Sequence, residues 1–244
     1  MTEETVVYHR PRLLTDKPMH YCPGCSHSAI NKILADTIAD MGLEDSVIGV
    51  SPVGCAVLIY DYINIDWVEA AHGRAPAVAT AISRLRRDRL VFTYQGDGDL
   101  SAIGISEAVH AATRGENITI IFVNNALYGM TGGQMAPTTP IDMKTVTCPK
   151  GRDAATHGHP LDMLALLASL PGVCFATREN VLSPTSVRRA ARSLRTAFEN
   201  TLERRGTSVI EFMAACPTNW KMSPIDAVVH LTKRLKTLKI GRIK

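Results

Sequence analysis

The strongest constraint on the fold is a series of short apolar runs that alternate with helical patterns. Between these runs apolar residues recur at helical spacing, in segments of 10 to 21 residues. Strands that alternate with such helices predict an α/β fold, in which a mostly parallel sheet is flanked by helices on both faces. The predicted strands are Ser46–Val50, Leu90–Tyr94, Ile118–Val123, Val173–Ala176 and Ser208–Met213. The predicted helices are Ser28–Met41, Ala75–Arg86, Ile105–Arg114, Leu161–Leu170 and Pro184–Arg204.

The composition is that of an ordinary globular protein, with 244 residues, of which 45% are hydrophobic and 20% charged. No internal repeat or low-complexity stretch divides the chain, so we predict a single domain over residues 1–244. The apolar runs are too short to cross a bilayer. The segment Met1–Leu14 lacks the apolar centre of a secretory signal. Together these patterns predict a cytoplasmic protein that is not inserted in a membrane.

The formal net charge of +4 is too small to indicate a protein that binds nucleic acid. Much of the positive charge lies in two segments, Arg188–Arg205 and Lys233–Lys244. Two interpretations are open for them. They form either a solvated helix face and a mobile tail, or a docking surface for an acidic partner.

Polar residues with unusual chemistry follow several of the predicted strands. In open parallel sheets ligands bind beyond the carboxyl ends of the strands, so the loops after Val50, Tyr94 and Val123 should converge. After Tyr94 the sequence continues as Gln-Gly-Asp-Gly-Asp, and after Val123 it continues as Asn-Asn. The glycines allow backbone N–H groups to approach a phosphate at the beginning of a helix. The aspartate would repel that phosphate unless a cation such as magnesium lies between them.

Four of the six cysteines are candidates for one metal or redox site: Cys22, Cys25, Cys55 and Cys216. Cys55 and Cys216 follow strands, whereas Cys22 and Cys25 precede the first helix in a Cys-Pro-Gly-Cys sequence. That position disfavours a thioredoxin-like site, and a cytoplasmic chain disfavours disulfides. Cysteine ligands suit zinc and an iron–sulfur cluster equally, so the spacing leaves both open. Cys174 lies within a strand and is predicted to be buried packing, and Cys148 receives no role.

The strand–GDGD–helix–strand–NN arrangement matches the signature of thiamine-diphosphate enzymes. More closely, the chain resembles the beta subunit of 2-oxoacid:ferredoxin oxidoreductases of the 2-oxoglutarate or branched-chain type. The resemblance runs from about Tyr21 to Trp220, through the segments YCPGCSH, SPVGC, AAHGRAPAVATA, YQGDGDLSAIG, VNNALYGMTGGQMAPT and CPTNW. It implies a pyrophosphate-type thiamine-diphosphate-binding fold and three cofactors, namely thiamine diphosphate, Mg²⁺ and a 4Fe-4S cluster. It also implies oxidative decarboxylation of a 2-oxoacid to an acyl-CoA, with electrons passed to ferredoxin.

The resemblance further implies a role for individual residues. The magnesium ligands would be Asp97, Asn125 and the carbonyl of Leu127. Other cofactor-binding residues would be Gly54, Cys55, Gly73, Gly96, Gly98, Asp99, Tyr128, Gly129 and Met130. The reacting end of the cofactor would face His72, Arg74 and Thr131. The cluster ligands would be Cys22, Cys25, Cys55 and Cys216. Alternatives remain for two of these residues, because His72 could cap the next helix and Arg74 could form a surface salt bridge.

Redox chemistry favours the cluster over zinc, since oxidising the acyl group requires two electrons to leave one at a time and zinc is redox-inert. Two other functions stay open. A non-redox thiamine-dependent 2-oxoacid decarboxylase or synthase subunit would leave the four cysteines idle. A nucleotide-binding module with structural zinc would bind no thiamine.

One part of a thiamine active site is missing from the sequence pattern. Thiamine enzymes need a glutamate beside the aminopyrimidine ring, and in two-domain enzymes a separate domain supplies it. The resemblance therefore implies a hetero-oligomer, in which a partner alpha subunit supplies this glutamate and the coenzyme A site. Leu58 lies where some 2-oxoglutarate-using relatives carry a lysine, which favours branched-chain or other apolar 2-oxoacids, but the substrate stays open.

Overall fold

The computed structural model describes residues 9–244, and it confirms the predicted fold class. A seven-stranded sheet runs in the order β2-β1-β3-β4-β8-β7-β9, and every pairing in it is parallel except β7–β9. Its strands are β1 (Val47–Ser51), β2 (Asp66–Glu69), β3 (Leu90–Gly96), β4 (Thr119–Asn124), β7 (Val173–Glu179), β8 (Thr207–Met213) and β9 (Gly241–Arg242). A separate hairpin joins β5 (Leu127–Tyr128) to β6 (Gln134–Met135).

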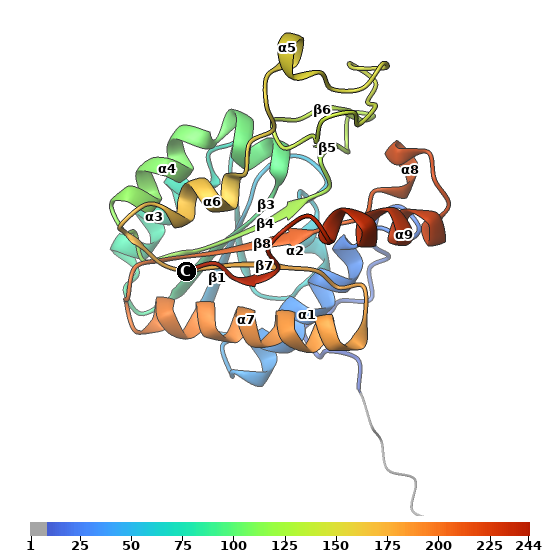
Figure 1. The fold of residues 1–244 in the computed structure, drawn as a ribbon. Coiled ribbons are helices and arrows are strands. Elements are labelled where there is room, and N and C mark those ends of the chain that lie inside the picture. Colours follow the sequence, from blue (N-terminus) through green and yellow to red (C-terminus); the bar gives the residue numbers. More distant parts are fainter. Residues whose placement is uncertain (1–8) are drawn as a thin grey trace, which may run out of the picture.

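Helices cover both faces of the sheet (Figure 1). One face carries α1 (His27–Asp40) and α7 (Pro184–Leu202), and the other carries α3 (Ala75–Leu85), α4 (Ile105–Thr113) and α6 (Met163–Ala168). Side chains alternate between the faces along a strand, so Phe92 joins the core under α1 and α7 while Val91 joins the core on the other face. A strand with two buried faces has no polar alternation, which is why these strands are continuous apolar runs in the sequence.

Smaller elements gather at the carboxyl ends of the strands. They are α2 (Ile59–Tyr62), the π-helix η1 (Asp99–Ile103), α5 (Ala154–His157), α8 (Pro217–Trp220) and α9 (Pro224–Leu235). The hairpin, α5, α8 and α9 lie at the same end of the molecule (Figure 1). A third core cluster joins α8 and α9 to this end of the sheet, and it includes Leu127, Met213, Trp220 and Leu231.

Apart from β6 and α5, residues 129–160 form no helix or strand, and a buried arginine organises much of this segment. Arg152 is 5% exposed, and its guanidinium donates to the carbonyl oxygens of Pro137, Thr139 and His159 at 2.8, 2.7 and 2.7 Å. These bonds satisfy carbonyl groups that no strand or helix pairs. The segment therefore has a defined conformation despite its lack of regular structure.

The interpretation of Lys233–Lys244 as a mobile tail is wrong. The first residues complete α9, and β9 then pairs antiparallel with the edge strand β7. The N–H of Ile243 donates to the carbonyl of Ala176 at 2.7 Å, and Lys244 Nζ donates to the carbonyl of Leu170 at 2.7 Å. Backbone pairing and a charge-assisted bond thus fix this basic segment on the sheet edge.

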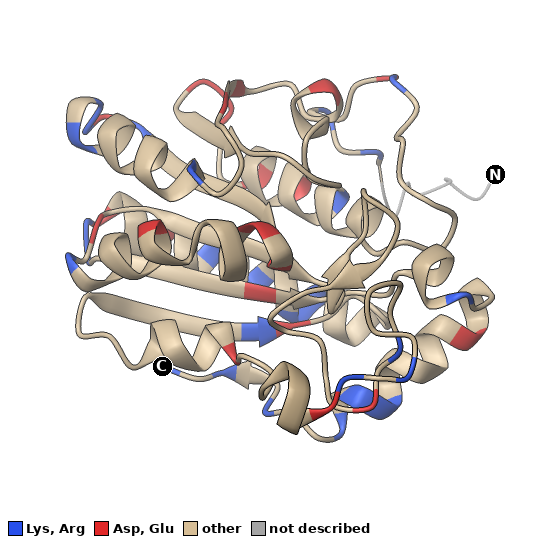
Figure 2. Ribbon diagram, turned by 90° about the horizontal axis from the view of Figure 1, so that it is seen from above, with Lys and Arg blue, Asp and Glu red and all other residues tan. Residues whose placement is uncertain are grey.

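Acidic and basic residues are interspersed along the ribbon (Figure 2). Within residues 9–244 no helix combines the length and the apolarity that a membrane span requires. The segment Met1–Leu14, which the sequence analysis considered for a secretory signal, lies partly outside the described residues.

Candidate functional site

The predicted loops converge at the carboxyl edge of the sheet. Their residues line a cavity of about 120 Å³: Val53, Gly54 and Cys55 after β1, Gly96–Asp99 at the end of β3, and Asn125 and Leu127–Thr131 after β4. His72 reaches it from the loop after β2, and His27 reaches it from the first turn of α1. The structure therefore brings together nearly all of the residues that the sequence assigned to the cofactor.

Asp97 is a buried carboxylate at the end of β3, with 2% of its surface exposed. One of its oxygens accepts the N–H of Ala126 at 3.0 Å and the hydroxyl of Thr138. Burial raises the pKa of Asp97 to about 6, although these hydrogen bonds and the more distant Arg234 partly oppose that shift. A buried carboxylate that is costly to ionise gains from a metal cation, so Asp97 fits a hard ion such as Mg²⁺.

The turn after β4 presents oxygen atoms next to Asp97. The side-chain oxygen of Asn125 accepts the N–H of Leu127 at 3.1 Å, and the Asn125 carbonyl accepts the indole N–H of Trp220 at 3.2 Å. Between them Ala126 has a φ of 68°, a left-handed conformation that is uncommon for a residue with a Cβ. The hydroxyl of Thr139 donates to the carbonyl of Ala126 at 2.5 Å and helps to hold this turn.

Asp99 connects the loop after β2 to the loop after β3. Its Oδ1 accepts the backbone N–H of Gly73 at 2.7 Å and pairs with Nδ1 of His72, and its Oδ2 accepts the amide of Gln95 at 2.5 Å. A Cβ on Gly73 or on Gly104 would collide with the backbone of the other residue. Asp99 thus lines the cavity while its carboxylate is occupied by protein groups, and it orients His72 toward the site.

The sequence left two alternatives open, that His72 caps the next helix and that Arg74 forms a surface salt bridge, and the structure shows only the second. His72 does not cap α3, whose N-cap is Arg74, because its ring pairs with Asp99. Arg74 forms an ion pair with Glu107 on α4 and does not line the cavity. For Arg74 the structure therefore shows the surface ion pair rather than an approach to the cofactor.

The hairpin forms the outer wall of the cavity. The hydroxyl of Tyr128 donates to the carbonyl of Gly98 at 3.3 Å, and a Cβ on Gly98 would lie 2.5 Å from the Tyr128 ring. Thr131 lies on the exposed rim and donates to the amide oxygen of Gln134 at 2.5 Å. Met130, also in the wall, is 48% exposed.

The four candidate cysteines gather beside this cavity. Burial raises the pKa of Cys25 to about 11 and that of Cys55 to about 12, and electrostatic interactions among the four cysteines add to this increase. Burial also raises the pKa of Cys216, whose sulfur accepts the Asn219 amide at 3.4 Å. A Cβ on Gly129 would lie 3.1 Å from the sulfur of Cys55, and both residues line the cavity, so the cysteines adjoin it directly. Neutral thiols of this kind need bound cations to ionise.

Zinc and an iron–sulfur cluster need different arrangements of cysteine ligands. Among residues 9–244 no three His, Cys, Asp or Glu side chains converge on a position for a single metal ion. Zinc requires ligands at about 2.0–2.3 Å from one point. A 4Fe-4S cluster instead takes one thiolate on each iron, so its ligands stand apart. The four cysteines stay candidates for either kind of site.

Comparisons with known proteins agree with this geometry. Residues 52–212 match the family described as "Thiamine pyrophosphate enzyme, C-terminal TPP binding domain", where thiamine pyrophosphate is another name for thiamine diphosphate. Over 236 residues the chain is 34% identical to 2-oxoglutarate synthase subunit KorB of Archaeoglobus fulgidus. This match covers 97% of this chain and 83% of KorB. The chain belongs to the beta subunits of the 2-oxoacid:ferredoxin oxidoreductases.

Other members of this family differ in length and substrate. The chain is 46% identical over 217 residues to ketoisovalerate oxidoreductase subunit VorA of Methanothermobacter thermautotrophicus, covering 89% of this chain and 46% of VorA. The chain thus spans about half the length of VorA. The 2-oxoglutarate:ferredoxin oxidoreductase from Magnetococcus marinus has a similar fold, with a TM-score of 0.77 and 25% identity over 93% of this chain and 73% of that one.

Several residues of this beta-subunit site were not predicted from the sequence. His27 and Val53 line the cavity, Thr138 bonds to Asp97, and Asn219 donates both to the carbonyl of Gly129 at 2.9 Å and to Cys216. His27 and Asn219 adjoin the cysteine motifs, and that proximity was the available signal. Thr138 carried no signal, because it lies far from Asp97 in the sequence.

The remaining cysteines lie elsewhere. Cys174 is half-buried in β7, where its sulfur contacts the carbonyl of Thr207 at 3.5 Å, so it packs less completely than predicted. Cys148 is buried in the 129–160 segment, with its sulfur 3.5 Å from Nε2 of His157.

Proposed function

We propose that the chain is the thiamine-diphosphate-carrying subunit of an enzyme that oxidatively decarboxylates a 2-oxoacid to an acyl-CoA and passes the electrons to ferredoxin. One observation carries the proposal. The sulfur of Cys55 and the side-chain amide of Asn125 both lie beside Gly129, since a Cβ there would be 3.1 and 3.3 Å from the two groups. A candidate redox group and a candidate thiamine site therefore share one wall, which a non-redox thiamine enzyme does not require.

The chain's own residues would hold the cofactor at its diphosphate end. Asp97, the side chain of Asn125 and the carbonyl of Leu127 would bind Mg²⁺, and the backbone at Gly96 and Gly98 would approach the phosphate oxygens. When bound, thiamine diphosphate supplies the electron sink for loss of carbon dioxide from the 2-oxoacid. His72, which Asp99 orients, and Thr131 on the rim would face the reacting end.

Cys22, Cys25, Cys55 and Cys216 would hold a 4Fe-4S cluster next to this site. The raised pKa values of Cys25 and Cys55 mean that these groups are thiols until cations bind, and iron would supply the stabilising charge. Asn219 donates to the sulfur of Cys216, and hydrogen bonds to cluster sulfurs tune the reduction potential. A reducing cytoplasm would keep all six cysteines free of disulfides.

A partner alpha subunit would complete the active site of this hetero-oligomer by supplying the pyrimidine-side glutamate and the coenzyme A site. The cavity of about 120 Å³ is smaller than the ~300–1,000 Å³ that enclose a cofactor-sized ligand. Apolar side chains at its opening, Val53 and Met130, are 39% and 48% exposed. A partner that covers this opening would enclose the cofactor and bury these side chains.

A branched-chain 2-oxoacid is the best-supported substrate. Identity is higher to the ketoisovalerate subunit VorA, at 46%, than to the 2-oxoglutarate subunit KorB, at 34%. Leu58 is apolar and packs partly buried beside the core, so at this position the chain offers no cation for a second carboxylate. Both observations favour ketoisovalerate over 2-oxoglutarate.

The test is a substrate panel on the complex purified with its partner under anaerobic conditions. Ketoisovalerate with coenzyme A should support reduction of ferredoxin or a viologen dye, and 2-oxoglutarate should support little. The protein should be brown, with broad absorption near 400 nm. Carbon dioxide release without electron transfer, from a colourless protein, would indicate a non-redox decarboxylase or synthase instead.

A further inference from the structure

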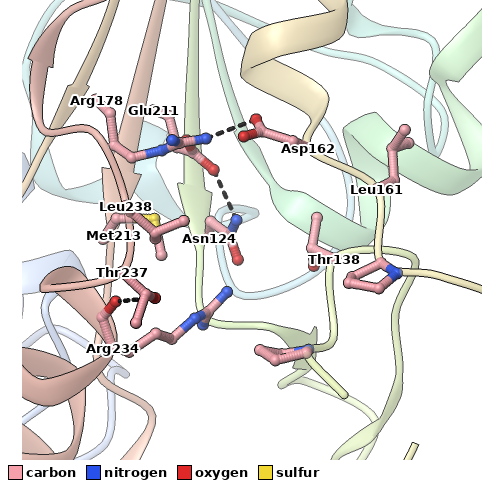
Figure 3. A pocket seen from close by; sticks show the side chains of 12 residues that line it. Asn124, Thr138, Leu161, Asp162, Arg178, Glu211, Met213, Arg234, Thr237 and Leu238 are labelled. Carbon is pink, nitrogen blue, oxygen red and sulfur yellow. Dashed lines mark hydrogen bonds and ion pairs between the residues drawn. The ribbon is translucent and has the colours of Figure 1, made fainter. Parts of the chain in front are cut away.

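Two further cavities lie near the candidate cofactor site, and Arg234 and Pro140 line both of them. The smaller, of about 180 Å³, also contains Asn124, Thr138, Arg178 and Glu211 (Figure 3). The larger, of about 580 Å³, lies between α9 and residues 140–144. None of these residues is assigned to the cofactor or the cluster.

Arg234 is the unusual residue of this region. It extends from α9 into the smaller cavity (Figure 3), and its Nη1 is shielded from solvent without a hydrogen-bond partner among residues 9–244. By contrast, Arg178 in the same cavity pairs with Glu211 and with Asp162. A buried guanidinium nitrogen without an acceptor is costly, so an acceptor from outside the chain would stabilise it.

Charge in the larger cavity favours an anion as that acceptor. Lys144, Lys233 and Arg234 contribute three positive charges, against one negative charge from Asp142. His230 lies in the same wall. Burial lowers its pKa, and the positive charges of Arg234 and Lys233 lower it further. Anions bind where such cations converge and water is partly excluded.

The rest of the lining is apolar. Ile141, Met143, Trp220 and Met222 line the larger cavity, and the Trp220 ring packs edge-on against His230 at 5.2 Å. The volume of about 580 Å³ lies within the ~300–1,000 Å³ that small-molecule sites occupy. An inorganic anion would use Arg234 but would leave these apolar walls in contact with water.

We propose that these two cavities, which share Arg234 and Pro140 in their walls, bind an organic anion, whose carboxylate or phosphate group contacts Arg234 and whose apolar body lies against Trp220 and Met222. The inference rests on Arg234 and the cavities, and it does not depend on which 2-oxoacid is the substrate. Arg234 also acts electrostatically on Asp97, so the bound anion would lie close behind the candidate magnesium site.

The test uses the full-length chain in its purified complex, saturated with Mg²⁺ and thiamine diphosphate so that the diphosphate site is filled. Calorimetry is performed with benzoate and with phenyl phosphate, which share an apolar ring but carry different anions. Phenol lacks the charge and inorganic phosphate lacks the ring. At least one of the two aromatic anions should bind with one site per chain, at least about tenfold more tightly than phenol or inorganic phosphate. If benzoate binds more tightly, the site prefers a carboxylate, and if phenyl phosphate binds more tightly, it prefers a phosphate group.

Arg234→Met should weaken that binding at least about tenfold while retaining apolar volume. The matched control is Lys236→Met, which removes an exposed positive charge two residues away and lines neither cavity. It should change the affinity less than about twofold. Thermal unfolding controls for misfolding.

Three results would overturn the proposal. They are the absence of saturable binding of either aromatic anion, equal binding by Arg234→Met, and a structure of the complex in which a carboxylate of the partner subunit occupies Arg234.

Discussion

The backbone N–H of Gly73 donates a hydrogen bond of 2.7 Å to Oδ1 of Asp99. This bond fixes the loop after β2 against the loop after β3, and the same carboxylate pairs with the ring of His72. A residue that the family resemblance assigned to the diphosphate therefore positions a histidine at the candidate cofactor site.

We predict that Asp99→Asn lowers kcat about 10- to 100-fold and changes thiamine-diphosphate affinity less than about threefold. The amide retains an acceptor for Gly73 but loses the charge that pairs with His72. The measurements are steady-state kinetics of the complex and calorimetry with the cofactor. Glu107→Gln is the control, since it removes the charge that pairs with Arg74 outside the cavity. A loss of cofactor affinity as large as the loss of kcat would show that Asp99 acts directly on the diphosphate or its metal.

Replacing Cys55 or Cys216 by Ala should remove or destabilise the cluster, because each would leave one iron without a thiolate. Cys174→Ala is the matched control, since Cys174 lies in β7 away from the four cysteines and should keep full iron content. Iron per chain is measured after anaerobic purification. Full iron content in both variants would mean that these cysteines are not the ligands, and zinc in the wild type would remove the redox function.

Stability should fall as pH decreases through the titration of His27. This histidine is 2% exposed with Nδ1 2.7 Å from the Tyr94 hydroxyl, and burial lowers its pKa from 6.5 to about 3. Between these two pKa values the unfolded chain binds a proton that the folded chain excludes. Each pH unit below about 6.5 therefore costs up to about 1.4 kcal/mol of unfolding free energy.

Denaturant unfolding at several pH values measures this effect. His27→Gln should flatten the dependence on pH between about 6.5 and 3, whereas His110→Gln, at an exposed histidine on α4, should not. Equal slopes for wild type and His27→Gln would show that His27 does not titrate differently in the folded chain.

The chain alone should release no carbon dioxide from a 2-oxoacid and should not reduce ferredoxin. The described cavity would hold the diphosphate end of the cofactor, and without a fixed glutamate the aminopyrimidine ring would not be positioned to activate it. The assay adds Mg²⁺, thiamine diphosphate and several 2-oxoacids to the chain, with and without the partner subunit. Turnover by the chain alone at the rate of the complex would refute a site divided between two subunits.

The sheet could be predicted from the sequence because its central strands are buried on both faces. Predicted and observed bounds of β1, β3, β4 and β8 agree within about two residues. The edge strand β2 was missed because Asp66-Trp-Val-Glu69 is short and mostly exposed, so no apolar run marks it. β9 was missed because only two residues pair and they lie in a basic segment.

The site was predictable where neighbouring residues form a motif, and unpredictable where distant segments meet. Asp97 and Asn125 follow strands whose ends had to be adjacent. Thr138, by contrast, reaches Asp97 through an irregular loop, and the contact of Asn219 with Gly129 depends on how α8 packs. The Arg74–Glu107 pair likewise depends on the relative positions of α3 and α4, which sequence spacing does not give.

Magnesium-dependent binding of thiamine diphosphate to Asp97→Ala is the most direct test of the proposed function. Calorimetry should show a loss of affinity larger than the 10- to 100-fold loss that follows when a residue hydrogen-bonded to a metal ligand is removed, because Asp97 would bind the metal directly. The exposed Asp66→Ala control should bind like wild type.

Because burial raises the pKa of Asp97 to about 6, wild-type affinity should also weaken below that pH as the carboxyl protonates. Without cofactor the stability of the Asp97→Ala variant should differ little from that of wild type, since the change lies in a loop and creates no core cavity. Unchanged cofactor affinity in Asp97→Ala would contradict the magnesium site and the thiamine-binding function proposed for this cavity.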